Sequence, residues 1–372
     1  MEFTDVGVLA PQLRGRMKRT LSTTQRVKAQ GVKLAADGLF RLGACDILRA
    51  TVVKRSRGEL GDASEVPFAV LLYHRVNPDR DPFFPSVRSD VFDAQMGYLA
   101  KHYRVLSLTK ILERLARGDG VEPCTVAITF DDGYRDNFLH AHRILRRYGL
   151  PATLFVAAGY LNSNSIMWND QLSAAFKNTK RTETTFETGD ERWVLPLRST
   201  NDRLNSLNQL IEFMKKLSED EKKAKCDSVI NELGTAESSE RLMLNWDELR
   251  RMNSEGWDIG SHTINHVILT RISQAAALVE LKESREMLEN NLDNPVSLLA
   301  YPNGKSSDFS TEIKSMARAT GYRGGMTTIE GFNRNGVDLF EVRRFSPWEE
   351  DLPSFAVKLG WRYWKESFAV LQ

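Results

Sequence analysis

Residues 125–156 contain two short apolar runs separated by an amphipathic segment, and this pattern limits the possible folds more than any other feature of the chain. The runs 125–130 and 152–156 have the length and apolar character of buried strands. The segment 136–148 has helical spacing, and Gly149 and Pro151 follow it as stop signals. A strand, a helix and a strand in so few residues form a βαβ unit, which requires parallel strands and a right-handed crossover.

The same alternation of apolar and amphipathic segments continues along the chain. Further strands are predicted at 68–73, 256–260 and 296–301, and near 323–326 and 342–345. Further helices are predicted at about 92–99, 245–253 and 273–290. Repeated units of this kind close most readily into a barrel, so we predict an α/β protein with a (β/α) barrel.

A polar stretch rich in Lys and Glu interrupts this alternation between about 162 and 241, and we interpret it as a helical insertion. We therefore predict a main domain at 67–360 that contains the insertion. A leader at 1–66 precedes this domain and a C-terminal tail at 361–372 follows it. At 372 residues, one large domain with an insertion is within the size range of closed α/β folds.

The leader is basic and prone to form helices, with twelve Lys and Arg between Arg14 and Arg57 against two Asp. Its imperfect apolar face allows two interpretations. In the first, residues 14–57 make a peripheral contact with an anionic membrane surface. In the second, they form a solvated helix packed on the main domain. We favour the packed helix, because patterns of this kind are weak indicators of membrane binding.

The net charge, the cysteines and the lack of long apolar stretches limit the possible partners and location of the protein. The formal net charge of +2 at pH 7 argues against nucleic acid as a partner. Cys45, Cys124 and Cys226 are scattered and odd in number, which favours a reducing compartment over a disulfide framework. No apolar stretch of the length of a secretory signal follows Met1, and no segment is apolar enough to span a bilayer. We expect a cytoplasmic location, with the cytoplasmic membrane face as the peripheral alternative.

Polar residues follow four of the predicted strands directly. They are His74, Asp131-Asp132-Gly133, Ser261-His262 and Pro302-Asn303-Gly304. The carboxyl ends of barrel strands carry the active site in this class of fold. The four groups are therefore expected to meet in one layer.

Asp131 and Asp132 place two like charges side by side at the end of an apolar strand. Burying such a pair is costly unless a cation or a shared proton compensates. Successive side chains of a strand diverge, so one carboxylate can bind a metal while the other acts as a base. Asp-Asp-Gly is also a common turn sequence, and by itself the pair does not decide between a site and a turn.

His262 and His266 are four residues apart, a spacing that places two imidazoles on one side of a helical turn and suits a zinc-type ion. Such a pair is also found incidentally on solvated turns. Its predicted position beside Asp132 favours a metal site. Two imidazoles and one carboxylate leave coordination positions open, which is typical of a catalytic metal rather than a structural one.

The segments Thr129–Gly133 and Ser261–His266 resemble motifs of the polysaccharide deacetylase family, the NodB-homology enzymes of carbohydrate esterase family four. The resemblance extends over roughly residues 67–348 and implies a distorted (β/α) barrel. It implies that the second Asp and both His of these segments, Asp132, His262 and His266, bind a divalent metal. Zinc is expected, with cobalt or nickel as alternatives, and Asp131 is implied as the catalytic base.

The segment Leu72–Val76 resembles a subgroup that includes deacetylases of poly-N-acetylglucosamine and other exopolysaccharides. In that subgroup an early His replaces the late His that serves other members as the catalytic acid. No His follows His266 in this chain. His74 is therefore the candidate acid, and the alternative is a loop histidine at the edge of the domain.

The third family motif normally begins with an Arg that orients the base, whereas this chain has Ala300-Tyr301-Pro302-Asn303-Gly304. Either Arg343 or Arg344 replaces that Arg, or the base is held differently. Family geometry implies that the Asn303 backbone N–H donates to the oxyanion. Tyr134 and Tyr301 are candidates for the substrate groove.

The resemblance implies removal of N-acetyl groups from N-acetylhexosamine residues of a bacterial exopolysaccharide or envelope glycan, including a lipid-linked intermediate. One alternative is hydrolysis of another amide or an ester at the same metal site. Another is a catalytically silent glycan-binding or assembly protein. The presence of Asp131 beside the expected ligands argues against the silent protein, which has no physical need for a base there.

Overall fold

The computed structural model describes residues 23–59, 66–162, 166–235 and 241–369. The chain forms two compact units. Of the described residues, the larger unit contains 23–59, 66–78, 87–162 and 241–369, and the smaller unit contains 79–86 and 166–235.

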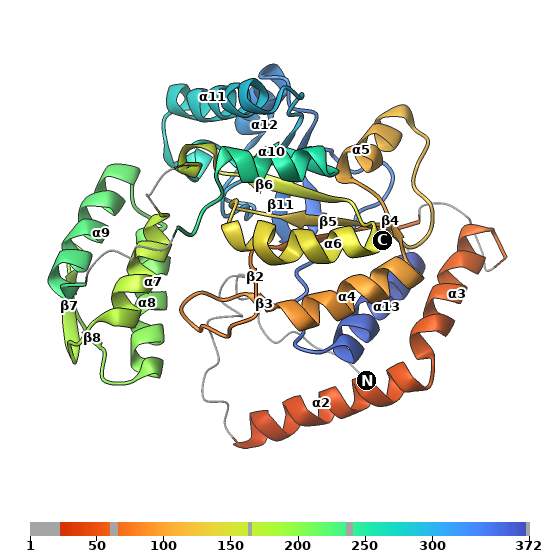
Figure 1. Ribbon diagram of the computed structural model, residues 1–372, viewed down its shortest axis with the longest axis horizontal. Helices are drawn as coiled ribbons and strands as arrows, with labels where there is room; N and C mark the ends of the chain where they lie inside the picture. Colours follow the sequence, from red (N-terminus) through yellow and green to blue (C-terminus); the bar gives the residue numbers. More distant parts are fainter. Residues whose placement is uncertain (1–22, 60–65, 163–165, 236–240, 370–372) are drawn as a thin grey trace. The chain divides into compact units, whose positions relative to one another are not determined.

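The larger unit is built around a parallel sheet that closes on itself (Figure 1). Its strands are β1 (Ala69–Tyr73), β4 (Arg104–Val105), β5 (Thr125–Phe130), β6 (Ala152–Val156), β9 (Trp257–Ser261), β10 (Leu298–Ala300), β11 (Gly324–Glu330) and β12 (Val342–Arg344). Seven of them are bonded in the order β1-β5-β6-β9-β10-β11-β12, and β4 pairs with the start of β5. Phe345 closes the ring, because Leu72 N–H donates to its carbonyl at 2.9 Å and its own N–H donates to the Val70 carbonyl at 2.8 Å. The predicted barrel is confirmed, with one strand fewer than a regular eight-stranded barrel.

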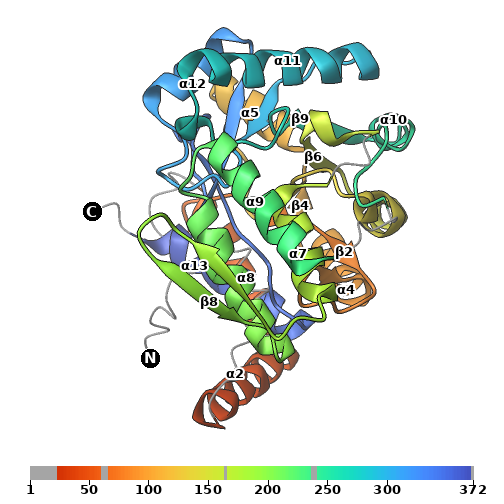
Figure 2. The ribbon, with the colours of Figure 1, turned by 90° about the vertical axis from the view of Figure 1, so that its left-hand side faces the viewer.

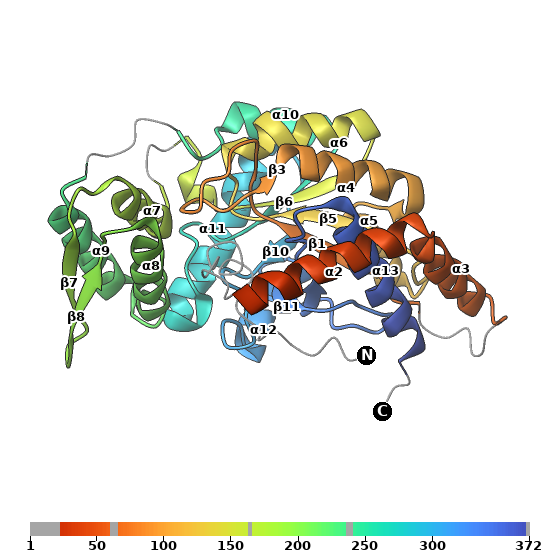
Figure 3. The ribbon, with the colours of Figure 1, turned by 90° about the horizontal axis from the view of Figure 1, so that it is seen from below.

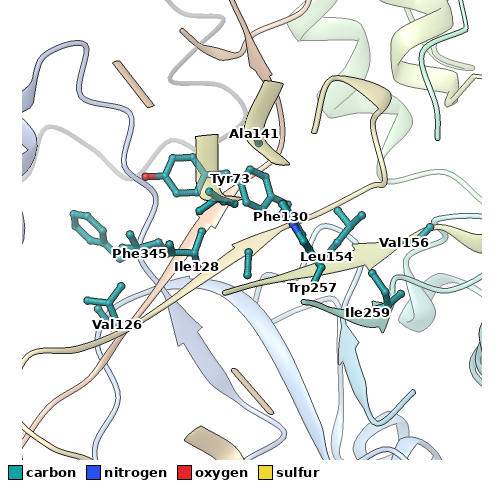
Figure 4. Close-up of a cluster of buried hydrophobic side chains, with 14 of the residues drawn as sticks. Tyr73, Val126, Ile128, Phe130, Ala141, Leu154, Val156, Trp257, Ile259 and Phe345 are labelled. Carbon is teal, nitrogen blue, oxygen red and sulfur yellow. The ribbon is translucent and has the colours of Figure 1, made fainter. Parts of the chain in front are cut away.

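The barrel strands read as continuous apolar runs because they are buried on both faces. Every residue of β1 and β5 is buried, and the two strands run parallel with Tyr73 opposite Phe130. The rings of Tyr73 and Phe130 stack with centroids 5.4 Å apart, and the ring centroid of Trp257 of β9 lies 5.1 Å from that of Phe130 (Figure 4). These rings bury large apolar areas near the carboxyl end of β5, so they provide a rigid support for the residues that follow it.

Helices follow the strands and cover the barrel. They are α4 (Ser89–His102), α5 (Leu108–Arg117), η1 (Asn137–Ala141), α6 (His142–Tyr148), η2 (Ala158–Tyr160), α10 (Trp246–Ser254), η3 (Leu269–Arg271), α11 (Gln274–Leu292), α12 (Thr311–Ala319) and α13 (Leu352–Phe368), with the short strands β2 (Val76–Asn77) and β3 (Val87–Arg88) between β1 and α4. The predicted helix at 136–148 is divided, because the π-helical turn η1 precedes α6. Within the described part of the chain, no helix combines the length and the apolar character needed to cross a membrane.

Two helices, α2 (Thr23–Arg41) and α3 (Ala44–Ser56), form the described part of the predicted leader and pack against α13 (Figure 3). Gly43 joins them with φ 74°, a left-handed conformation that favours glycine. Cys45 and Val52 of α3 are buried, and the buried Arg49 donates to the Tyr98 hydroxyl at 2.6 Å. The described part of the leader is therefore attached to the barrel, as the packed-helix interpretation requires.

The prediction of a C-terminal tail beginning at 361 is wrong, because α13 continues to Phe368. Phe355, Leu359 and Tyr363 lie one helical turn apart and are all fully buried. The Tyr363 hydroxyl accepts from Ala69 N–H at 3.0 Å and donates to the Thr125 carbonyl. The helix thereby binds the starts of β1 and β5 and forms part of the barrel's outer layer.

Figure 2 shows the ribbon of the smaller unit, which has an apolar core of its own. Its elements are α7 (Trp168–Asn178), β7 (Glu183–Glu187), β8 (Arg192–Pro196), α8 (Thr200–Met214) and α9 (Glu219–Leu233). β7 and β8 form an antiparallel hairpin that buries Phe186 and Leu195. The predicted helical insertion also contains this hairpin, where burial alternates with a period of two. Capping boxes at Ser199 and Ser218 begin the two helices that follow.

The burial of α13 predicts that the barrel depends on it. Leu359→Ala is expected to lower the free energy of unfolding by about 2–5 kcal/mol, because it leaves a cavity against α3 and the barrel. The exposed Lys365→Ala on the same helix is the matched control and is expected to change it by less than about 0.5 kcal/mol. Urea denaturation measures both, and equal values for the two variants would contradict a structural role for α13.

Candidate metal centre

Three ligand-type side chains meet at the carboxyl ends of β5 and β9. Asp132 lies two residues beyond β5, His262 directly follows β9, and His266 ends the turn after it. Asp132 Oδ1 lies 3.4 Å from His262 Nε2 and 3.3 Å from His266 Nε2. One donor atom from each residue lies within 4.8 Å of the other two. The structure thus brings together the three predicted ligands.

This donor set fits a zinc-type ion. His262 Nδ1 hydrogen-bonds the Ala300 carbonyl at 2.7 Å, which requires a proton on Nδ1 and leaves Nε2 toward Asp132 as the free lone pair. Asp132 Oδ1 and His266 Nε2 are buried, and neither has a hydrogen bond of normal geometry among the described residues. Burial alone would raise the pKa of Asp132, but the two imidazoles hold it well below its usual range. Positive charge is therefore favoured at this position, and a divalent cation supplies it while leaving coordination positions open.

The backbone around these residues is unusual. Asp132, His266 and Asn303 have φ of 78°, 55° and 60°, in the left-handed region that non-glycine residues rarely adopt. Each costs about 1–3 kcal/mol, and such conformations cluster at functional sites. Gly133 follows with φ 88°, and a Cβ there would lie 3.1 Å from Val156 Cγ1. The Asp-Asp-Gly sequence therefore forms a turn and also directs a ligand into the site.

A buried carboxylate from α11 holds the turn between the two histidines. Glu280 Oε2 accepts from the N–H groups of Ile264 and Asn265 at 2.8 and 3.0 Å. Glu280 Oε1 accepts from Asn265 Nδ2 at 2.7 Å. Sequence reasoning did not identify Glu280. The available signal was an acidic residue next to Leu281 on the buried side of a predicted amphipathic helix.

The predicted base Asp131 forms a buried ion pair. Arg344 donates from Nη1 to Asp131 Oδ1 and from Nη2 to Oδ2, both at 2.7 Å, and from Nε to the Thr327 carbonyl at 2.7 Å. Burial alone would raise the pKa of Asp131, but Arg344 lowers it below its usual value. Arg343 is exposed, and its backbone pairs with the Asn333 side chain. Of the alternatives predicted for orienting Asp131, the structure therefore selects Arg344.

The candidate acid His74 lies directly after β1, in the same layer as Asp131. Burial lowers the pKa of His74, and the nearby Asp132 and Asp131 carboxylates oppose this shift only in part. A protonated His74 is consequently a stronger proton donor than an exposed histidine. Its position at the site is observed, and its role as acid stays a prediction.

Asn303 lies in the loop after β10. Its carbonyl accepts from Thr328 Oγ1 at 2.7 Å, and its Nδ2 donates to Asp308 Oδ2. Among the described residues, no acceptor is bonded to its backbone N–H. That N–H can therefore serve as the predicted donor to an oxyanion, because its flanking groups are fixed.

The predictions that Tyr134 and Tyr301 line the substrate groove are wrong, because both side chains are buried. Tyr134 is 4% exposed, and the Arg75 guanidinium lies 4.7 Å from its ring centroid. Tyr301 is fully buried, stacks on Phe309 at 4.9 Å and donates to the Phe340 carbonyl at 3.1 Å. Both aromatic side chains therefore pack against other residues of the protein.

Comparisons with known proteins agree with this geometry. A family model described as polysaccharide deacetylase matches residues 119–325, a range that contains all three predicted ligands. The polysaccharide deacetylase YxkH of Bacillus subtilis (strain 168) is 21% identical over 276 residues, which cover 74% of this chain and 69% of that protein.

Solved structures of similar fold include two that this chain covers almost completely. The deacetylase PplD of Streptococcus pyogenes, in complex with acetate, has a TM-score of 0.53 at 20% identity over 80% of this chain and 99% of that one. IcaB from Ammonifex degensii has a TM-score of 0.51 at 18% identity over 80% of this chain and 98% of that one. At these identities, the two structures show the barrel fold alone.

The Glu280 contacts predict that α11 controls metal affinity. Glu280→Gln removes the charge and one acceptor oxygen from the turn, so we expect zinc affinity to fall about 10–100-fold with the barrel still folded. Competition with a chromophoric chelator measures the affinity, and far-UV circular dichroism checks the fold. Glu283→Gln, an exposed acid on the same helix, is the matched control. If the two variants bound zinc equally well, Glu280 would have no role in holding the ligands.

Proposed function

The chain belongs to the polysaccharide deacetylase family and is a carbohydrate deacetylase, and from this premise we propose that it removes N-acetyl groups from N-acetylhexosamine residues by metal-dependent hydrolysis. The substrate class we propose is a bacterial exopolysaccharide or envelope glycan, including lipid-linked intermediates. The observation that carries the proposal is the ion-paired Asp131 directly beside the Asp132, His262 and His266 cluster.

In this proposal the cluster is the metal site. A divalent ion, with zinc expected, would be held by Asp132, His262 and His266 and would supply Lewis-acid polarisation of the acetamide carbonyl and a lower pKa for water. Arg344 is not a ligand, because both of its Nη atoms are bonded to Asp131.

Asp131 takes the proton of the attacking water in this proposal. The depressed pKa of Asp131 keeps it ionised at neutral pH, so it is always ready to accept a proton. The two hydrogen bonds from Arg344 fix the plane of the carboxylate and prevent it from rotating toward the imidazoles. Arg344 thus orients the Asp131 carboxylate but also makes it a weaker base.

His74 and Asn303 complete the reaction. The backbone N–H of Asn303 donates to the oxyanion that forms when water adds to the carbonyl. His74 delivers a proton to the nitrogen as the C–N bond breaks, which releases acetate and leaves a free amino sugar. Burial lowers the pKa of His74, and this favours the proton transfer.

The role of Asp131 is tested by acetate release from N-acetylglucosamine oligomers with zinc, cobalt or nickel restored after chelation. Asp131→Asn is expected to lower kcat by about 10²–10⁴, because the general base is lost. Glu248→Gln, which removes a carboxylate bonded to Arg135 and Arg241, is the matched control and is expected to retain activity. Metal content and melting temperature show whether each variant is folded and loaded.

Two outcomes of that assay would reject parts of the proposal. Activity that survives Asp131→Asn would reject the assigned base. A loaded wild-type enzyme that releases no acetate from any oligomer, but cleaves another amide or an ester in a substrate panel, would favour the alternative hydrolase. Glycan binding without any hydrolysis would favour the silent protein.

The role of His74 is tested by the pH dependence of kcat/KM. His74→Gln is expected to lower kcat about 10²–10⁴-fold and to remove the fall in rate on the alkaline side, because that limb reports loss of the acid's proton. His102→Gln is the control, since His102 lies on α4 beside Arg49. An alkaline limb that persists in His74→Gln with unchanged metal content would exclude His74 as the acid.

A further inference from the structure

Large hydrophobic side chains are exposed mainly on one helical layer of the larger unit. Nine of them are exposed in the described part of the chain, and six belong to the layer formed by α2, α3 and α13. The six are Val32, Leu34, Leu39, Leu42, Ile47 and Trp361. Exposed apolar residues that gather on one layer mark an interaction site more often than scattered single residues do.

Helix α2 buries one side and leaves several apolar residues exposed. Ala36 and Phe40 pack on the barrel side. With 3.6 residues per turn, Leu34 projects from the opposite side and Leu39 from the flank, while Leu42 follows the last residue of the helix. Leu34 and Leu42 are 68% and 81% exposed, so packing on the barrel does not account for these apolar residues.

The three helices of this layer are basic. Together α2, α3 and α13 contain ten Lys and Arg against Asp37, Asp46 and Glu366, a net charge of +7, whereas the whole chain has +2 and the remainder therefore has −5. This asymmetry attracts the layer to an anionic surface and directs the acidic remainder away from it.

Aromatic residues extend the surface onto α13. Trp361 is 43% exposed and stacks on Trp364 with centroids 5.0 Å apart. Arg55 of α3 lies over the Phe368 ring at 4.9 Å. Tryptophan together with basic and aliphatic side chains is the composition of segments that lie at the interface of a bilayer.

We propose that the outer face of α2, with the α2–α3 turn and Trp361, binds the surface of an anionic phospholipid membrane and holds the barrel there. A symmetric dimer through this face would bring two strongly cationic surfaces together, which charge repulsion opposes. A hydrated polyanion would match the charge but not the exposed leucines. An anionic bilayer satisfies both features, and the proposal does not depend on the reaction catalysed.

The test measures binding of the full chain to vesicles of phosphatidylglycerol and phosphatidylcholine, and to vesicles of phosphatidylcholine alone, by sedimentation. The wild type is expected to bind the anionic vesicles and to be released by salt. The triple variant Leu34→Gln, Leu39→Gln, Leu42→Gln is expected to bind at least about tenfold more weakly, because it loses apolar contact area. The matched control Leu278→Gln, Val279→Gln changes exposed aliphatic residues on α11 and is expected to bind like the wild type.

Melting temperature and acetate release from a soluble oligomer show that the triple variant is folded and its site intact. The proposal is overturned if the wild type does not bind anionic vesicles or if the triple variant binds as tightly as the wild type. It is also overturned if sedimentation equilibrium shows a dimer that the triple variant abolishes while vesicle binding is absent, because the occupant of the face is then a second copy of the chain.

Discussion

The buried ion pair between Asp131 and Arg344 is the contact on which the arrangement of the site depends. Its members are 213 residues apart in sequence and meet because Phe345, next to Arg344, closes the barrel against β1. Removing both charges from water costs several kcal/mol, and paired hydrogen bonds with ideal partners are needed to offset it. The two oxygens of Asp131 and the Thr327 carbonyl provide those partners. The contacts that close the barrel therefore also place Arg344 where it orients the proposed base.

Two adjacent acids at the end of one strand are tolerated because each has its own source of positive charge. Arg344 neutralises Asp131 from β12, while Asp132 turns through a left-handed backbone toward His262 and His266. Arg344 thereby favours the ionised form of Asp131, while Asp132 lies against two imidazoles in a group that could hold a cation. This division also explains why strained residues concentrate here, since the closed barrel and the Glu280 contacts hold conformations that an isolated loop would not keep.

The two ends of the barrel differ in the groups that they carry. The metal centre lies at the carboxyl ends of β5 and β9, whereas Tyr363 of α13 bonds at the starts of β1 and β5. Helices α2 and α3 are attached through α13. The contacts that attach α13, and through it these helices, therefore lie at the opposite end of β5 from the metal centre.

The sequence by itself determined the features that depend on near neighbours. Apolar runs placed the strands of the barrel, and the Asp131-Asp132 and His262–His266 spacings indicated the metal centre. Only the tertiary structure decided between Arg343 and Arg344 and showed that Tyr301 is buried in the core. It also showed that α13 continues past 361 and that Glu280 holds the turn between the two histidines. Those outcomes depend on strand register and on the direction of side chains in a closed barrel. The partners lie outside the local segment, from 15 and 16 positions away for Glu280 to 213 for Arg344, so local periodicity does not encode them.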